Sequence, residues 1–252
     1  MGSAERAELI AQRPNKTVYK VGNTKVKIYN KDISNVEVLE TALNQAKIEE
    51  TGILMPKLLE VKTQDGRWEI VSEYIEGTPL DGLMKKYPER EDEYLEMFVN
   101  LQMSIHTKRS NGLLKIKEKM MRKIEQTDFD NVIKYELQTR LEGMPNHVKV
   151  CHGDFNPTNV IVTEDGEMYV IDWSHATQGN ASADVARTYL LFCLDGKEDM
   201  AEKYLQLFCE KSGTTKRYVQ RWFPIVAASQ TVKKNEREKE LLSKWVNVVE
   251  YE

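Results

Sequence analysis

The sequence predicts an α+β fold in which a small antiparallel sheet precedes a larger, mainly helical part. Segments with alternating residue types lie between residues 17 and 75 and flank glycine-containing turns, which is typical of β-hairpins. Beyond residue 90 the apolar residues recur at helical spacing, as at Tyr94, Phe98 and Ile105. A chain of 252 residues can bury a large core, as one domain or as two lobes.

In the N-terminal part we predict strands at 17–21 and 25–29, a helix from Ser34, and strands at 57–63 and 67–75. Gly22-Asn23 is a two-residue hairpin turn, and Gln64-Asp65-Gly66 joins the second pair of strands. Ser34 followed by Glu37 is a capping box, which indicates a helix start. The apolar stripe of this helix is predicted at Val36, Leu39, Leu43 and Ala46.

The C-terminal part is predicted to contain helices near 115–127, 130–142, 198–211, 215–235 and 237–248. A further helix is expected to be capped by Ser182 and to hold Asp184 in its first turn, where an acid complements the helix dipole. His106 follows the apolar stripe of the long helix, so we expect it to be packed or capped rather than a metal ligand.

Composition limits the possible partners. The net charge is −4, and no basic run with interleaved aromatic residues indicates nucleic-acid binding. The chain has neither a membrane-length apolar run nor a secretory signal, so we expect a cytoplasmic protein without membrane association. Cys151, Cys193 and Cys209 are predicted to be buried thiols. The sequence does not indicate an oligomeric state.

The most informative stretch is 147–175, which reads as three short strands. Asp154 follows the first strand, Asn159 opens the second, and Asp172 ends the third. Because side chains at strand ends can gather without being buried, we expect these three to converge. Two carboxylates and an amide oxygen are hard oxygen ligands that suit Mg²⁺.

The spacing of these residues resembles a kinase active site. His152-Gly153-Asp154, Asn159 five positions later, and Asp172-Trp173-Ser174 after an apolar strand are similar to the catalytic loop and metal-binding Asp of kinases. In this form the segment resembles the aminoglycoside phosphotransferase and choline kinase family. The resemblance implies a two-lobed protein kinase-like fold, with residues 1–76 as the nucleotide-binding lobe and 77–252 as the catalytic and acceptor-binding lobe.

The resemblance also implies roles for these residues. Asp154 would orient the acceptor hydroxyl and take its proton, while Asn159 and Asp172 would hold the Mg²⁺ that bridges the phosphates of ATP or another nucleoside triphosphate. His152 and Asp184 would support the catalytic loop from behind. The other partner would be a small molecule with a hydroxyl group.

For the nucleotide, the resemblance implies a strand lysine that contacts the α- and β-phosphates. We choose Lys27, with Lys25 as the competitor. Glu40 on the following helix is the predicted ion-pair partner of this lysine, although Gln45 and Glu49 are also near. The backbone of Glu73, Tyr74 and Ile75 is expected to bind the adenine edge.

Three alternatives remain. A protein Ser/Thr kinase-like enzyme is disfavoured because Gly153 replaces the usual arginine and few residues separate Asp172 from the next helix. The second alternative is a nucleotide-binding module without turnover, and the third is a metal hydrolase that uses His152, Asp154, Asp172 and His175. A cationic acceptor would require acidic groups, and the acidic run at 89–96 is either such a site or a solvated helix face.

Overall fold

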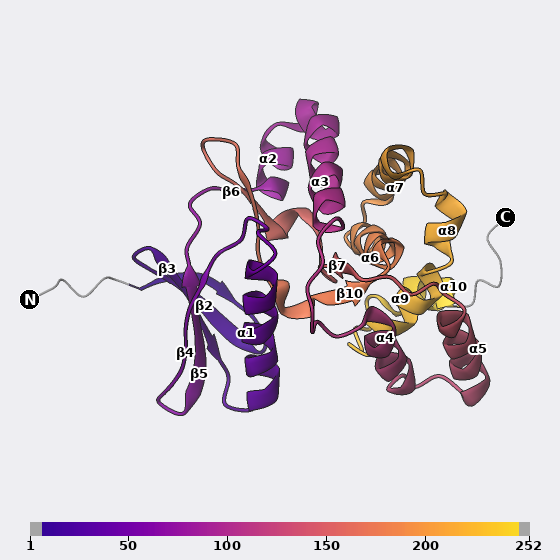
Figure 1. Ribbon diagram of the computed structural model, residues 1–252, viewed down its shortest axis with the longest axis horizontal. Coiled ribbons are helices and arrows are strands. Elements are labelled where there is room, and N and C mark those ends of the chain that lie inside the picture. The colour runs from indigo at the N-terminus through magenta and orange to yellow at the C-terminus, as the bar shows by residue number, and fades with distance from the viewer. Residues whose placement is uncertain (1–6, 247–252) are drawn as a thin grey trace, which may run out of the picture. The chain divides into compact units, whose positions relative to one another are not determined.

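The computed structural model describes residues 7–246, and the chain divides into two compact units (Figure 1). The first comprises the chain up to Lys86 together with Pro157–His175, and the second comprises Tyr87–Asn156 and the chain from Ala176 onward. This division differs from the predicted boundary at residues 76 and 77, because a later segment of the chain packs with the N-terminal part. None of the helices described combines the length and the apolar character that a bilayer span requires.

The first unit contains a five-stranded antiparallel sheet in the order β1-β2-β3-β5-β4. Its strands are β1 (Glu8–Gln12), β2 (Lys16–Val21), β3 (Thr24–Tyr29), β4 (Leu58–Gln64) and β5 (Arg67–Glu73). The predicted hairpins are confirmed, and Asp65 and Gly66 both have positive φ, as a two-residue hairpin turn requires. The exposed edge strand β1 was not predicted.

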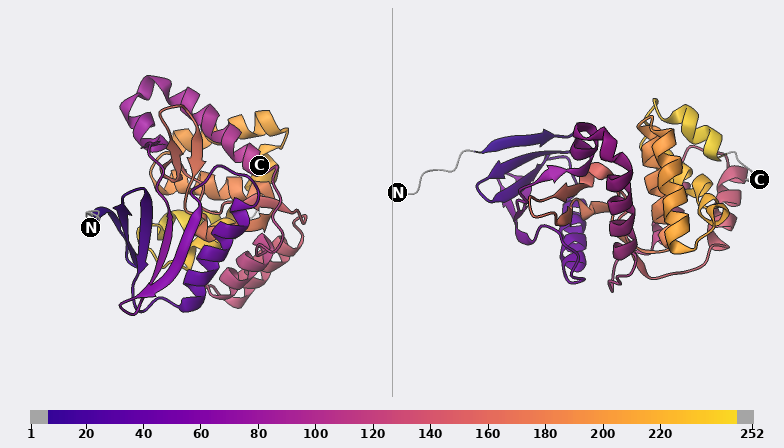
Figure 2. Two further views of the ribbon diagram at one scale, coloured as in Figure 1. Left: turned by 60° about the vertical axis from the view of Figure 1, so that its left-hand side comes forward. Right: turned by 90° about the horizontal axis from the view of Figure 1, so that it is seen from above.

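Helix α1 (Asn35–Glu49) begins where it was predicted, since the Ser34 side chain accepts a hydrogen bond from Val36 N. This helix lies against the sheet (Figure 2). Its Val38 and Ala42 form a buried cluster with Tyr29 and Ile70.

The predicted apolar stripe of α1 is wrong. Val36, Leu39 and Leu43 are 62%, 46% and 51% exposed. The buried face is instead formed by Val38, Thr41, Ala42 and Ile48. The helix has two apolar faces, and only packing against the sheet decides which of them is buried.

The rest of the first unit continues the chain from β5 and includes the segment that returns later in the sequence. It consists of β6 (Thr78–Pro79), α2 (Leu80–Lys86), a 3₁₀ turn η2 (Pro157–Asn159), β8 (Val160–Val162), β9 (Met168–Val170) and a 3₁₀ turn η3 (Trp173–His175). Strands β8 and β9 form the predicted hairpin, and β6 pairs with β8. Gly77 permits this pairing, because a Cβ atom there would lie 2.5 Å from Val162 O.

The second unit is mainly helical. Its elements are a 3₁₀ turn η1 (Pro88–Arg90), α3 (Glu91–Ile105), α4 (Ile116–Glu125), α5 (Asn131–Glu142), β7 (Lys149–Cys151), β10 (Thr177–Gly179), α6 (Ala181–Leu194), α7 (Glu198–Ser212), α8 (Lys216–Gln220), α9 (Phe223–Thr231) and α10 (Lys239–Val246). Strand β7 pairs with β10, not with the β8–β9 hairpin. Asn180, rather than the predicted Ser182, caps α6.

The core of this unit is aromatic and lies between α3, α6 and α7. Phe98 on α3 is fully buried and stacks on Phe155 with 4.3 Å between the ring centroids. The predicted helix at 215–235 is two helices, because Pro224 lacks the N–H group that a continuous helix would need there. Helices α9 and α10, yellow in Figure 2, pack against each other. The predicted end of the last helix at residue 248 lies outside the described residues.

Candidate active site

In the first unit, Asp172 lies two residues after the end of β9, close to the start of β8. Ile171 N donates to Asn159 O at 2.9 Å, so Asn159 and Asp172 are brought to the same end of the hairpin. Asp172 has φ of 63°, a left-handed conformation that costs energy for a residue with a side chain. Such a conformation is common where the surrounding structure must orient a functional side chain.

Two lysines of the sheet contact the Asp172 carboxylate. Lys27 Nζ lies 3.0 Å from Oδ1, and Lys16 Nζ lies 3.8 Å from Oδ2. Lys27 is buried because it lies on β3, between β2 and β5. Burial opposes ionisation of Asp172, but the charges of Lys27 and Lys16 outweigh it and hold the pKa of this carboxyl well below its usual range. Asp172 is therefore ionised at neutral pH.

Lys25, the competitor of Lys27, lies two positions earlier on the same face of β3. Burial, together with the charge of Lys27, lowers the pKa of Lys25 to about 7. Burial and the charge of Lys27 also lower the pKa of Lys16. Three basic side chains thus surround one carboxylate, and an additional anion such as a phosphate would relieve their repulsion.

The predicted ion pair between Lys27 and Glu40 is not present. At about 100° per residue, Glu40 is roughly 200° around α1 from the buried Val38, and it is exposed. Gln45 donates to Pro56 O, and Glu49 accepts from Leu58 N. Lys27 is instead paired with Asp172.

The predicted adenine-binding segment follows the end of β5. Glu73 N and Tyr74 N donate to Lys57 O and Asn23 O, at 3.0 and 2.9 Å. These two amides therefore take part in the sheet. Ile75 N has no hydrogen-bond partner within the described part of the chain.

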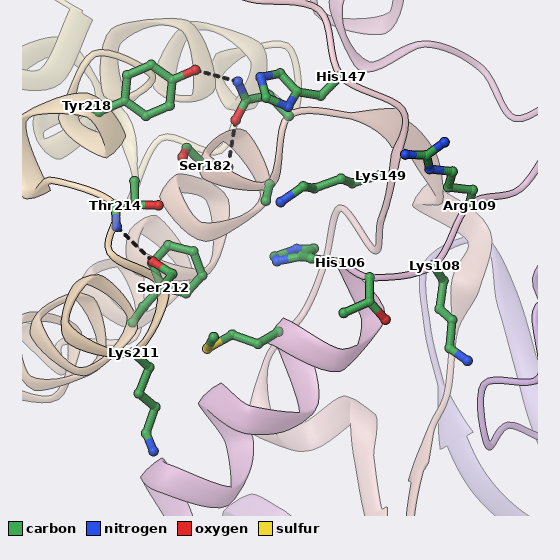
Figure 3. A pocket seen from close by; sticks show the side chains of 15 residues that line it. His106, Lys108, Arg109, His147, Lys149, Ser182, Lys211, Ser212, Thr214 and Tyr218 are labelled. Atoms are coloured by element: carbon green, nitrogen blue, oxygen red, sulfur yellow. Dashed lines mark hydrogen bonds between the residues drawn. The ribbon is translucent and has the colours of Figure 1, made fainter.

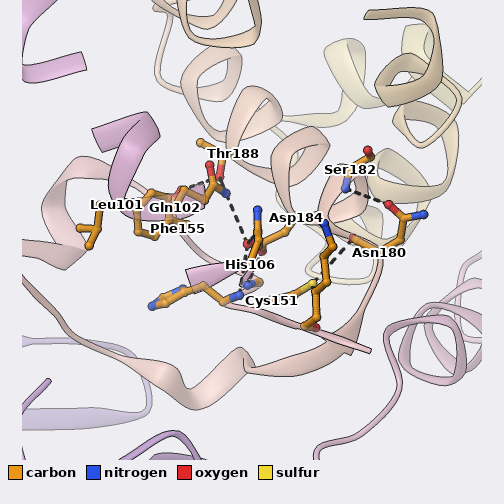
Figure 4. Close-up of polar contacts among 12 residues, drawn as sticks. Leu101, Gln102, His106, Cys151, Phe155, Asn180, Ser182, Asp184 and Thr188 are labelled. Carbon is orange, nitrogen blue, oxygen red and sulfur yellow. Dashed lines mark hydrogen bonds and ion pairs between the residues drawn. The ribbon is translucent and has the colours of Figure 1, made fainter. Parts of the chain in front are cut away.

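In the second unit, the buried Asp184 carboxylate holds the backbone of the loop predicted to be catalytic, at His152 and Gly153 (Figure 4). Gly153 N donates to Oδ1 at 2.7 Å, and His152 N donates to Oδ2 at 3.2 Å. His106 Nε2 lies 3.1 Å from Oδ2, and Gln102 Nε2 donates to the same oxygen at 3.3 Å. His106 is thus packed, as predicted.

These interactions determine the charge of Asp184. Burial opposes ionisation, but the hydrogen bond and charge of His106, together with the Gly153 N–H group, lower the pKa of Asp184. The carboxylate is therefore a fixed anion within the core, and it orients the peptide groups directly before Asp154.

Asp154 itself is held by contacts that sequence reasoning missed. Its Oδ1 lies 3.3 Å from Arg187 Nη2, and Arg187 Nη1 donates to Gln230 Oε1 at 2.7 Å. Asp154 N donates to His152 Nδ1 at 3.2 Å. Arg187 lies three positions after Asp184 on α6, so both side chains share one face of the helix. The three-residue spacing from Asp184 was the sequence feature that could have indicated a role for Arg187.

The structure thus brings the predicted residues together in two groups. Lys27, Asn159 and Asp172 lie together in the first unit, whereas His152, Asp154 and Asp184 lie together in the second. Among residues 7–246, no group of three or more His, Cys, Asp or Glu side chains is placed to hold a metal ion. This arrangement gives no support to the metal hydrolase alternative.

A cavity of about 490 Å³ lies behind the catalytic loop in the second unit (Figure 3). His106, Lys149, Ser182 and Tyr218 contribute to its lining, and Asp154 does not. His106 Nδ1 is buried and has no hydrogen-bond partner in the described chain. The cavity therefore borders His106, the partner of Asp184, rather than the Asp154 carboxylate.

Solved structures of known proteins share the fold of this chain. The chain shares its fold with a thermostable mutant of aminoglycoside phosphotransferase APH(4)-Ia, with 14% identity, a TM-score of 0.70, and coverage of 98% of this chain and 97% of that chain. Choline kinase LicA from Streptococcus pneumoniae gives 16% identity, a TM-score of 0.66, and coverage of 96% and 92%. A ternary complex of a thermostable APH(4)-Ia mutant with AMP-PNP and hygromycin B has 15% identity and a TM-score of 0.69, with coverage of 95% of this chain and 89% of that chain.

These similarities confirm the predicted α+β, protein kinase-like fold class. A comparison with curated protein sequences gave no match. The sequence model of the phosphotransferase enzyme family matches residues 17–219, which is most of the chain. This protein therefore belongs to the phosphotransferase enzyme family.

Proposed function

We propose that this phosphotransferase is an ATP-dependent kinase that transfers the γ-phosphoryl group to a hydroxyl of a small molecule. The observation that carries the proposal is the Asp172 carboxylate, kept ionised beside Lys27 and Lys16 at the end of a strand. A carboxylate and several ammonium groups together suit a metal-bound polyphosphate. The neighbour in complex with AMP-PNP supports the choice of nucleotide.

The residues of the first unit fit a magnesium ion. Asn159 and Asp172 offer an amide oxygen and an ionised carboxylate, which are hard ligands, and Mg²⁺ commonly binds one or two protein carboxylates plus phosphates and water. When bound, the ion would neutralise charge on the phosphate oxygens during transfer. Lys27 would bind the α- and β-phosphates, and Ile75 N–H would bind the adenine edge.

Asp154 is the proposed base. The acceptor hydroxyl oxygen forms a bond to the γ-phosphorus, and the bond from that phosphorus to the bridging oxygen of ADP breaks. The hydroxyl proton passes to the Asp154 carboxylate. Because phosphoryl transfer depends mainly on positioning and charge, the contribution of the protein is to orient this carboxylate. His152, Asp184 and Arg187 do so through the loop backbone and the ion pair.

A small acceptor is favoured over a protein. Only residues 173–180 separate Asp172 from α6, and most of them lie in η3 and β10. A regulated loop or a platform for peptide binding does not fit within this segment. The neighbours named for aminoglycosides and choline also act on small molecules.

The test compares wild type with Asp154→Asn in ADP release from ATP and Mg²⁺ with a panel of small hydroxyl compounds. We expect the variant to lose at least ~100-fold in turnover, within the usual range for a general base, while AMP-PNP binding is retained. Asp92→Asn is the matched control, because Asp92 is 84% exposed on α3.

Equal ADP release by wild type and Asp154→Asn would contradict the proposal and favour a nucleotide-binding module without turnover. Phosphorylation of a generic protein substrate, but of no small molecule, would favour the protein kinase alternative. Binding of AMP-PNP that is unchanged in Asp172→Asn and Lys27→Ala would contradict the proposed nucleotide site.

A further inference from the structure

Four basic side chains of the second unit gather around Asp154, and we call them the basic cluster. They are Lys119 and Lys123 on α4, Arg187 on α6, and Lys233 after α9. Lys119 and Lys123 are one turn apart and share a face of α4, next to the buried Met120 and Ile124. Helix α4 packs against α9, and α6 also packs against α9 (Figure 1).

Few carboxylates act on the basic cluster. Arg187 is paired with Asp154, the charges of Glu238 and Asp184 also act on Arg187, and those of Asp154 and Glu238 act on Lys233. Asp184 is occupied by His106 and two backbone amides.

Lys123 and Lys233 form no ion pair with a carboxylate among the described residues. Neither ammonium group has a carboxylate within 4.0 Å in the described part of the chain. Lys123 is only partly exposed, so water compensates its charge incompletely. Gathering partly buried cations opposes folding, and proteins keep such arrangements where binding requires them.

Four of the five acidic residues in the run considered for a cationic acceptor are, by contrast, already paired. Lys203 contacts Glu91 and Asp92, Lys211 contacts Glu96, and Arg90 contacts Glu93. These are surface ion pairs along α3, as expected of a solvated helix face.

We infer that the acceptor carries an oxyanion group, such as a phosphate or carboxylate, which the basic cluster binds while a hydroxyl of the same molecule meets Asp154. The inference rests on the proposed function, because Asp154 is assigned there as the residue that contacts the acceptor. It places the anion next to the reacting hydroxyl, since Arg187 touches Asp154 directly.

The protonation of the cluster supports the assignment. Burial, together with the charges of Lys123 and Arg187, lowers the pKa of Lys119 to about 7. Burial lowers the pKa of Lys123 to about 8, helped by Arg187 and Lys233. The carboxylates of Asp154 and Asp184 act in the opposite direction. A bound anion would raise both lysine pKa values, so binding is expected to take up protons near neutral pH.

The first experiment measures sulfate binding by calorimetry in the absence of nucleotide, with chloride at equal ionic strength as the blank. Sulfate keeps its charge of −2 across the range tested. We expect Lys123→Gln to weaken binding about tenfold or more, the effect of one lost charge contact in a partly screened site. Arg122→Gln is the matched control, because Arg122 is the adjacent residue on α4 and is exposed.

The melting temperature of Lys123→Gln distinguishes a loss of sulfate binding from a loss of folding. Removing one of several repelling cations does not destabilise the free protein, so Lys123→Gln should melt at or above the wild-type temperature without sulfate. Lys27→Ala should keep the response to sulfate, which shows that the anion is not in the nucleotide site. Sulfate binding equal in wild type and Lys123→Gln would overturn the inference.

The second experiment uses glucose, glucosamine, gluconate and glucose 6-phosphate, which share a hexose frame but differ in charge. We expect both anions to bind at least about tenfold more tightly than glucosamine, and the difference to vanish in Lys123→Gln. The tighter of the two anions identifies the phosphate or carboxylate class. Tighter binding of glucosamine would overturn the inference.

Binding should also weaken as the pH rises from 6 to 9, because Lys119 and Lys123 lose their protons in this range. Sulfate binding that does not change with pH would count against the basic cluster as its site. Lys123-dependent sulfate binding without any ADP release would contradict the proposed function alone. ADP release with a cationic acceptor would contradict this inference alone.

Discussion

The replacement Asp184→Asn tests whether one buried carboxylate supports the catalytic loop. Asp184 is 1% exposed and accepts four hydrogen bonds, from Gly153 N, His152 N, Gln102 and His106. An asparagine keeps one acceptor oxygen, but its NH₂ group then faces donors. Removing one partner of a buried charged interaction costs about 3–5 kcal/mol, and we expect a loss of about 4 kcal/mol in the free energy of unfolding.

The assay is urea unfolding at pH 7, combined with hydrogen exchange of the loop. We expect the amide of either His152 or Gly153 to exchange faster in Asp184→Asn, because the NH₂ group replaces the oxygen that accepts from one of them. Turnover should fall with unchanged AMP-PNP affinity, since the loop and Asp154 shift while the first unit is unaffected. Asp92→Asn is the matched control and should change stability by less than about 0.5 kcal/mol.

The pH dependence provides a further check. The pKa of Asp184 is lower in the folded chain than the value of about 3.9 expected for an unfolded Asp. Its contribution to stability is therefore fully present above pH ~3.9 and is lost as the pH falls through the lower folded value. The stability difference between wild type and Asp184→Asn should shrink below pH ~4. A loss under 1 kcal/mol at pH 7 would refute the reasoning.

Three further predictions concern the scaffold. Gly77→Ala should unfold the β6–β8 pairing, because its Cβ would lie 2.5 Å from Val162 O, and the melting temperature should fall by several degrees. Ser34→Ala should cost about 1 kcal/mol in urea unfolding, because it removes the cap of α1. Phe98→Ala should cost about 3–5 kcal/mol by the same measurement, because this ring is fully buried. Effects below half of these values would contradict the packing described.

Local sequence patterns predicted much of the secondary structure. The turns at Gly22-Asn23 and Asp65-Gly66 define hairpins because few residues adopt the backbone conformations they need. The hairpin of β8 and β9 and the start of α1 at its Ser34 cap were likewise predicted. The order of Asp154, Asn159 and Asp172 along the chain indicated the family.

Where a sequence pattern is compatible with more than one arrangement, the sequence did not decide between them. Helix α1 has two apolar faces, and the sheet buries the one that carries Val38. The partner of Lys27 was predicted to be Glu40, the nearest suitable acid on the next helix, yet it is Asp172. A lysine on a strand has many acids within reach of its side chain, and only the path of the backbone selects one of them.

By itself the sequence determined the elements, their order and the chemistry of the catalytic motif, because these depend on neighbouring residues. Only the tertiary structure decided which distant charges meet. His106 and Asp184 are far apart in the chain, as are Arg187 and Asp154, yet each pair is in contact. Such pairings depend on how helices pack, and packing is a property of the whole core rather than of any short segment.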